Sequence, residues 1–297
     1  MPNTLTNVKD IKVAQRALMP FTANLLPVTA LSTNFGPQQA DKGDTVRVPL
    51  IGAPGQSSDF AGDYTANSDS TVITMPVTLN RHKFKTVHVT AREASETAMD
   101  LLDTLVETAA QQLAQDVLLD ILSVVTQANF GAPLSAVAAT NFNYKKVLEA
   151  REKCGEAKMP ASPRSLVLDA GHYTNLLADD VVAKSFNLNL SAPGVTEGLI
   201  KRLAGFDLHE TVVIPSDHAE KLVGFAVHPS AIAVAMRYLV PVAEYQQSGA
   251  VTDPQTGMTF GYLRFTDTRA NKVFVTIECL YGFAVGKSDA LKRIVKP

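Results

Sequence analysis

The sequence predicts an α+β fold in which one long helix separates a strand-rich segment from an α/β subdomain. Residues 92–125 contain no Gly or Pro and are rich in Ala, Leu, Gln and Glu, which are strong helix formers. Before this stretch, residues 43–90 alternate apolar and polar side chains, as strands do. After it, residues 142–242 alternate strand patterns with helix patterns, which is typical of an α/β unit.

The composition limits the class of protein. A chain of 297 residues is long enough to bury a sizeable core, and we expect two subdomains. Lys plus Arg number 27 against 29 Asp plus Glu, and this balance argues against a protein that holds nucleic acid through a concentrated positive surface. The chain does not begin like a secretory signal, and polar residues interrupt its most apolar window, 222–236. We therefore expect synthesis in a cytoplasm and no membrane contact.

The N-terminal residues, 1–40, are predicted to form an arm. Pro20 and Pro27 fall among its apolar positions, and proline breaks long helices. We expect an extended segment with short helical turns that packs onto another surface.

Residues 41–90 are predicted to form an extended β-hairpin loop, followed by the strand that leads into the helix. Residues 43–52 and 71–80 alternate as two strands, and the segment between them is rich in Gly, Ser, Asp and Asn. An isolated hairpin is marginal in water, so a projecting hairpin needs support from a neighbouring subunit. Pro49 and Pro76 indicate exposed edges. Two strands of an ordinary sheet joined by a loop fit the pattern equally well.

The long helix lies in a predicted peripheral region, residues 91–140. Thr90 or Ser95 is expected to cap the helix, and Glu93, three residues after Thr90, would complete a capping box; Asn129 and Gly131 are expected to end the helix. A helix of roughly 50 Å needs support along its length, which we expect from the two C-terminal strands and from the base of the hairpin. The positions predicted to face the core are Ala94, Ala98, Leu101, Leu102, Leu105, Ala109, Leu113, Val117, Ile121 and Val124. The polar face carries Glu96, Asp100, Asp103, Glu107, Gln111 and Gln115.

The rest of the chain is predicted to form an axial region, residues 141–242, and a return to the peripheral region, residues 243–297. Within the first we expect helices at 141–157 and from Ala170, strands at 165–169 and 222–228, and a turn at Gly205. Within the second we expect two strands, 258–265 and 272–280, joined by a turn.

The sequence offers no catalytic constellation. Its six histidines show no metal-ligand spacing, and phosphate-binding or nucleophile motifs are missing. Cys154 and Cys279 occupy apolar patterns, so we expect core residues rather than nucleophiles. Arg81, Lys83 and Lys85 alternate on one face of a strand, where they could meet phosphate, although a salt bridge between subunits or plain solvation is the stronger expectation. We expect a protein that is not an enzyme and has no cofactor or metal.

Two observations together point to a known family, namely the order of the predicted parts and five local sequence segments. The segments are KGDTVRVP at 42–49, ASPRSLVLDAGHYTNLL at 161–177, GLIKRLAGFDLHET at 198–211, HPSAIAVAMR at 228–237 and DPQTGMTF at 253–260. Over residues 41–285 the chain resembles the major capsid proteins of tailed bacteriophages. Their fold, shared with herpesvirus shells and encapsulins, has an N-arm, an extended loop, a spine helix in a peripheral domain, and an axial domain. Family members often carry a helical scaffolding segment before the arm, whereas this chain begins almost directly with the arm.

The resemblance implies a coat protein of the virion that assembles as pentamers and hexamers into an icosahedral head around double-stranded DNA, without sequence-specific binding. Its partners would be further copies of itself, a separate scaffolding protein, a portal and decoration proteins. An encapsulin shell that encloses cargo enzymes is the alternative, and an enzyme of unknown type comes third. The residues predicted to contact other subunits are Asp59, Phe60, Asp63, Tyr64, Arg81, Lys83, Lys85, Glu96 and Glu107.

Overall fold

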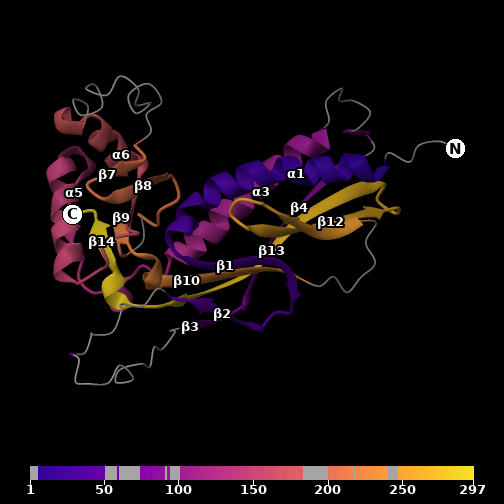
Figure 1. Cartoon of the computed structure of the whole chain (residues 1–297). Coiled ribbons are helices and arrows are strands. Elements are labelled where there is room, and N and C mark those ends of the chain that lie inside the picture. Colours follow the sequence, from indigo (N-terminus) through magenta and orange to yellow (C-terminus); the bar gives the residue numbers. More distant parts are fainter. Residues whose placement is uncertain are drawn as a thin grey trace.

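Two six-stranded sheets, lying at opposite ends of an elongated molecule, organise the fold (Figure 1). The computed structural model describes residues 6–50, 59, 74–90, 92–93, 101–182, 200–216, 219–239 and 247–297, with residues 6–13, 101, 103 and 247 described by their backbone alone.

The first sheet is built around one long strand, β13 (Lys272–Val285). The predicted C-terminal strand pair is confirmed, because β12 and β13 pair antiparallel with Asp267 opposite Lys272. Asn271, in the turn between them, has a φ of 51°, which asparagine tolerates better than most residues. The sheet order is β1 (Ser32–Ala40), β10 (Ile232–Leu239), β13, β12 (Thr259–Asp267) and β11 (Gln247–Thr252), with β4 (Arg81–Thr90) also paired to β13.

The second sheet carries short helices. Its order is β5 (Ser135–Ala136), β14 (Leu291–Val295), β9 (Leu222–Val227), β6 (Ser165–Asp169), β8 (Phe206–Thr211) and β7 (Arg202–Leu203). It is accompanied by η2 (Ala139–Asn141), α5 (Tyr144–Glu156) and α6 (Ala170–Leu177). The predicted helices and strands of this region are confirmed, as is the turn at Gly205, which has a φ of 88°.

Sheet membership departs from the predicted regions at two strands. β10, which follows the short turn η3 (Pro229–Ala231), lies in the first sheet. β14, which follows η4 (Ser288–Ala290), lies in the second sheet. Both strands are apolar enough to be buried in either sheet, so their pattern alone could not assign them. The domain boundaries themselves stay a prediction.

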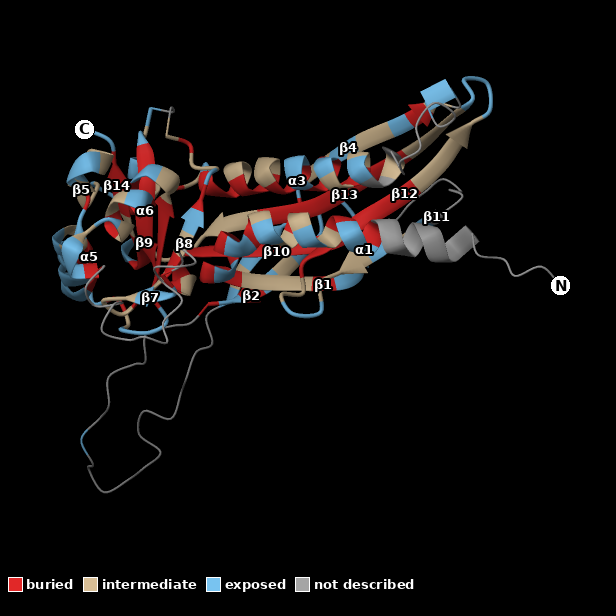
Figure 2. Ribbon diagram, turned by 90° about the horizontal axis from the view of Figure 1, so that it is seen from above, coloured by how far each residue is buried: buried red, intermediate tan, exposed pale blue. Residues whose placement is uncertain are grey.

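Helices α1 (Thr6–Leu25) and α3 (Leu101–Leu122) lie side by side on one face of the first sheet (Figures 1 and 2). The prediction of an extended N-terminal arm is therefore wrong, because α1 is a continuous helix with Pro20 inside it. An internal proline costs about 3 kcal/mol. The buried apolar stripe of α1 offsets that cost, because burying each large side chain stabilises the fold by about 1.5–3 kcal/mol. The stripe consists of Ala14, Ala17, Phe21 and Leu25.

Thr90 and Glu93 form the predicted capping box, and the long helix α3 is described from Leu101 onward. The Thr90 N–H donates to Glu93 Oε2 at 2.8 Å, and the Glu93 N–H donates to Thr90 Oγ1 at 3.3 Å. Residues 94–100, including Glu96, lie outside the described residues. The predicted end at Asn129 is wrong, because α3 ends at Leu122 and Thr126 then caps a separate short helix, α4 (Gln127–Phe130). Gly131, with a φ of 74°, ends α4 instead.

The inward face of α3 agrees with the prediction at Ala109, Leu113, Val117 and Ile121, which are buried, but it is wider than predicted. Leu105 and Val124 are only partly buried. The helix touches both α1 and the sheet, so its buried side is wider than a single stripe. That side consists of Val106, Ala109, Ala110, Leu113, Ala114, Val117, Leu118, Ile121 and Leu122.

The predicted hairpin pairing is confirmed for β2 (Thr45–Pro49) and β3 (Thr74–Thr78), in which Arg47 lies opposite Pro76. Residues 51–58 and 60–73 lie outside the described residues. The hairpin packs on the opposite face of the first sheet from α3, so the expectation that α3 rests on the hairpin is wrong. The expected contact with the C-terminal strands is confirmed for β13, and α3 also contacts β4. The cluster under the hairpin contains Ala40, Val48, Leu50, Val77, Leu79, Ala233, Ala235 and Leu280.

The orientation of α3 predicts different costs at two leucines. Leu113→Ala removes a side chain that is 2% exposed and should lower the free energy of unfolding by about 2–5 kcal/mol. Leu105→Ala should cost distinctly less, and Glu107→Gln should stay within about 0.5 kcal/mol. Urea unfolding of unassembled subunits measures all three. Equal losses at Leu105 and Leu113 would contradict the orientation described above.

Candidate functional site

The basic row on β4 is used within the chain at two of its three positions. Arg81 Nη1 donates to Asp120 Oδ1 at 2.7 Å, and its guanidinium lies 4.4 Å from the centre of the Phe283 ring. Lys83 Nζ donates to the Asp116 carbonyl at 2.8 Å. Lys85 is exposed. The row therefore fastens α3 to β4, and its role between subunits stays a prediction.

Asp120 also accepts from a buried tyrosine of β13. The Tyr281 hydroxyl donates to Asp120 Oδ2 at 2.6 Å. Burial raises the pKa of Tyr281 far above its usual range, and the hydrogen bond to Asp120 raises it further, so the hydroxyl stays protonated and keeps donating. This bond fixes the register of α3 on the sheet.

The other face of β4 carries an exposed apolar residue that the sequence prediction missed. Phe84 is 63% exposed. It shares this face with His82, whose Nε2 lies 3.0 Å from Glu278 Oε2, and with Thr86, which bonds Thr276 on β13. The sequence did carry a signal for this residue, because Phe84 is the single apolar side chain among the alternate positions on this face of β4, which are otherwise polar. Phe84 is therefore a further candidate contact for another molecule.

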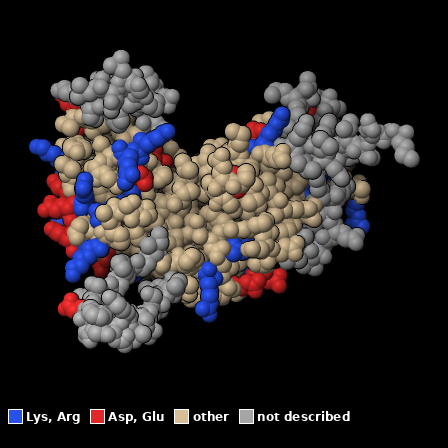
Figure 3. Space-filling model, in the orientation of Figure 1, with Lys and Arg blue, Asp and Glu red and all other residues tan. Residues whose placement is uncertain are grey.

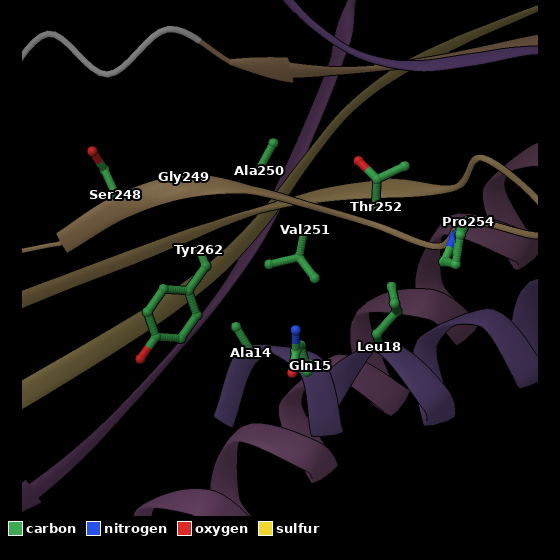
Figure 4. A pocket seen from close by; sticks show the side chains of 10 residues that line it. All are labelled: Ala14, Gln15, Leu18, Ser248, Gly249, Ala250, Val251, Thr252, Pro254 and Tyr262. Atoms are coloured by element: carbon green, nitrogen blue, oxygen red, sulfur yellow. The ribbon is translucent and has the colours of Figure 1, made fainter. Parts of the chain in front are cut away.

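A pocket of about 530 Å³ lies between α1 and the edge strand β11. Figure 4 shows Leu18 of α1 and Val251 of β11 pointing toward one another across it, with Tyr262 of β12 beside them. β11 pairs with β12 alone among the described strands, and a side chain at Gly249 would meet no atom within 4 Å. An open sheet edge beside an apolar pocket is a surface that can accept a strand and one of its side chains.

The other predicted contact residues are placed only in part. Asp59 is exposed, and Glu107 lies half-buried on α3. Phe60, Asp63, Tyr64 and Glu96 lie outside the described residues.

A carboxylate–imidazole pair, in which the imidazole is buried and the carboxylate half-buried, anchors α6 in the second sheet. Asp169 caps the helix by accepting from the His172 N–H at 2.8 Å, and it also bonds the His172 ring. His172 Nε2 lies 3.0 Å from the Val137 carbonyl. Burial opposes the charged form of both groups, but their mutual hydrogen bond prevails, so the pKa of Asp169 is lowered and that of His172 is raised.

Features that would support catalysis are few. Among the described residues, no three of the types His, Cys, Asp and Glu lie close enough to hold a metal ion. Cys154 and Cys279 are core residues, as predicted, and burial raises the pKa of Cys154 and raises that of Cys279 to about 12. Such thiols are poor nucleophiles at neutral pH.

The surface charge is mixed. In Figure 3, lysine, arginine and acidic residues are interspersed around the second sheet, and few charges cover the middle of the visible face. No helix in the described part of the chain is long and apolar enough to span a membrane.

The fold is similar to several solved structures. A structure from Mycobacterium phage Che8 is 19% identical, with 85% of each chain covered and a TM-score of 0.55. The capsid of Cyanophage P-SCSP1u is 12% identical, with 89% of this chain and 86% of that chain covered and a TM-score of 0.53. A virus-like particle from Pyrococcus furiosus is 12% identical, with 96% of this chain and 99% of that chain covered and a TM-score of 0.57. The predicted capsid fold is therefore confirmed. No protein-family model and no curated protein matches the sequence.

The Asp169–His172 pair predicts a pH-dependent stability. Asp169 stabilises the folded state at pH values above its ordinary pKa of 3.8. This stabilisation is lost as the pH falls through its lowered pKa. His172 contributes below its ordinary pKa of 6.5 and loses this contribution as the pH rises through the raised value. The stability lost in His172→Gln should therefore be larger at about pH 5 than at about pH 9. Urea unfolding at both pH values measures this difference, with Glu149→Gln as a surface control. An equal loss at both pH values would contradict it.

Proposed function

We propose that this chain is the major capsid protein of a tailed bacteriophage, assembling as pentamers and hexamers into an icosahedral head around double-stranded DNA. The observation that carries the proposal is the fold, which matches phage structures over at least 85% of the chain. A fold that recurs in several capsid structures supports a role in assembly, by analogy with those structures.

The surfaces of the subunit support assembly. Three features of the subunit could be covered by another copy. They are the pocket between α1 and β11, the open edge of β11 and the exposed Phe84. The hairpin base is held by a buried cluster, so it can present residues 51–73 to another copy. In this proposal Phe60 or Tyr64 supplies an apolar anchor, and Asp59, Asp63, Lys85, Glu96 and Glu107 form polar contacts around it.

The head would be built with a separate scaffolding protein, a portal and decoration proteins, and its subunits would be synthesised in the host cytoplasm. DNA would be confined without sequence-specific recognition, because the chain has a net charge of −2 and no base-reading motif.

An encapsulin-type compartment is the second candidate. The fold is shared with a virus-like particle from Pyrococcus furiosus over 96% of this chain and 99% of that one, so the fold alone does not restrict the shell to a phage head. The two candidates differ in content, since a phage head encloses DNA and a compartment encloses protein.

The first test is assembly. The expressed chain, with scaffolding protein if required, should sediment as large particles that appear as closed shells in electron micrographs. Nuclease-protected DNA in particles from infected cells supports the phage head, and a co-purified cargo enzyme supports the compartment. A compact monomer at high concentration, with and without scaffolding protein, would contradict both.

The second test is the hairpin tip. Replacing residues 53–70 with a short Gly-Ser linker should leave the free energy of unfolding of the subunit nearly unchanged, because β2 and β3 remain. Shell yield should fall roughly tenfold or more, as expected when a contact worth about 1.4 kcal/mol is lost.

A second variant tests whether the side chains of the hairpin tip, rather than its length, are needed for assembly. A variant of full length with Phe60→Ser and Tyr64→Ser should assemble poorly as well, whereas Lys145→Gln, on the exposed side of α5, should assemble normally. Normal shells from the deletion variant would exclude the hairpin as a contact between subunits.

A further inference from the structure

A hollow of about 330 Å³ lies between the C-terminal end of α5 and the segment that joins β13 to β14. Lys158 lines it from the α5 side, and Lys287 lines it from the other. A second hollow of about 570 Å³ adjoins it, sharing Lys158 and Asp289, and adds Lys153, Glu156 and Lys292 to the lining.

The charges of these two hollows do not cancel. Lys153 binds Glu156 at 2.7 Å, and Lys292 lies 3.9 Å from Asp289, so each carboxylate already faces a lysine. Lys158 and Lys287 form no ion pair within the described part of the chain. The lining therefore carries two positive charges beyond its two matched pairs.

A buried guanidinium lies behind the first hollow. Arg164 is 8% exposed, and its Nε donates to the Pro160 carbonyl at 2.6 Å while Nη2 donates to the Met159 carbonyl. Both carbonyls belong to residues that line the hollow. Arg164 thus adds a third positive charge, and it also occupies carbonyl oxygens that would otherwise repel an anion.

The positive field extends to a buried histidine next to the hollow. Burial lowers the pKa of His228, and the positive charges of Arg164 and Lys287 lower it further. Its Nδ1 accepts from the Ser230 N–H at 3.3 Å, so Nε2 carries the hydrogen of the neutral ring. Neutral His228 adds no charge of its own, and the Asp289 carboxylate in the lining is matched by Lys292, so the hollow stays net positive.

We propose that this hollow, between Lys158 and Lys287 and in front of Arg164, binds a phosphate group. Lysine is a common phosphate ligand acting as a point charge, and the walls come from two separate segments that can reach an anion from opposite sides. The group belongs either to a free phosphoanion or to the backbone of a nucleic acid. The site lies within one chain and does not depend on the proposed shell.

A purely structural role is the competing explanation. Lysines near a helix C-terminus favour the helix dipole, and Lys158 lies two residues after the last residue of α5. In that case the hollow would bind no anion.

The experiment uses the unassembled full-length chain and isothermal titration at constant ionic strength. Inorganic pyrophosphate is one probe, and a short single-stranded oligonucleotide without terminal phosphates is the other. The double variant Lys158→Gln/Lys287→Gln should lower the affinity at least about tenfold, whereas Lys145→Gln/Lys201→Gln, with the same charge change at exposed positions outside both hollows, should retain it.

Thermal unfolding without ligand checks that both double variants are folded. Lysine-dependent binding of pyrophosphate alone assigns a free phosphoanion, and lysine-dependent binding of the oligonucleotide assigns a nucleic-acid phosphate. Absence of binding by both probes, or an equal loss in the two double variants, overturns the proposal.

Discussion

The packing on both faces of β13 is the constraint on which most of the molecule depends. Residues Ile277, Cys279 and Tyr281 lie under α1 and α3, while Leu280 and its alternate neighbours face the hairpin. A Cβ at Gly282 would lie 2.2 Å from the Thr78 carbonyl, so only glycine lets the hairpin backbone come this close. A single strand thus positions the helical layer on one side and the hairpin base on the other.

A continuous apolar core joins the two sheets, and an ion pair with a buried guanidinium ties the second sheet to α4. Phe225 of β9 belongs to the same cluster as the inward face of α3. Arg293 of β14 is 1% exposed, binds Glu220 and donates to the Gly131 carbonyl at 2.9 Å. Glu220 also accepts from the Gln127 N–H at the start of α4. Removing one member of a buried pair leaves an uncompensated charge, so this contact fixes the second sheet relative to the end of α3.

Local patterns predicted the local structure of this chain well. The capping box at Thr90, the hairpin pairing and the C-terminal strand pair all depend on neighbouring residues, and all were confirmed. The N-terminal helix was missed because the cost of Pro20 is visible in the sequence, whereas the burial of Phe21 against Phe260 is not. The sheet membership of β10 and β14 was missed because a strand that is buried at nearly every position carries no periodic signal that assigns it to one sheet.

The candidate surfaces were harder to predict, for the same reason. Leu18 and Val251 line one pocket although they are far apart in sequence, and Lys158 and Lys287 line one hollow only because the segment after β13 lies beside the end of α5. Residues on one strand, such as Arg81 and Lys83, could be grouped correctly, but their acceptors on α3 could not be named in advance.

The placement of the hairpin has a mechanical consequence for the proposed shell. The hairpin base is buried on β13 through Val77 and Leu79, and the opposite face of that strand carries the α3 layer. If the hairpin tip contacts a neighbouring copy, the hairpin base therefore cannot rotate to follow that contact without opening the core of its own subunit. Buried side chains of this size contribute about 1.5–3 kcal/mol each, so the base resists displacement more strongly than a single contact between subunits can drive it. In the proposed shell, the direction of the hairpin base would thus be set by the fold of the subunit, and adaptation to different neighbours would have to occur beyond the base.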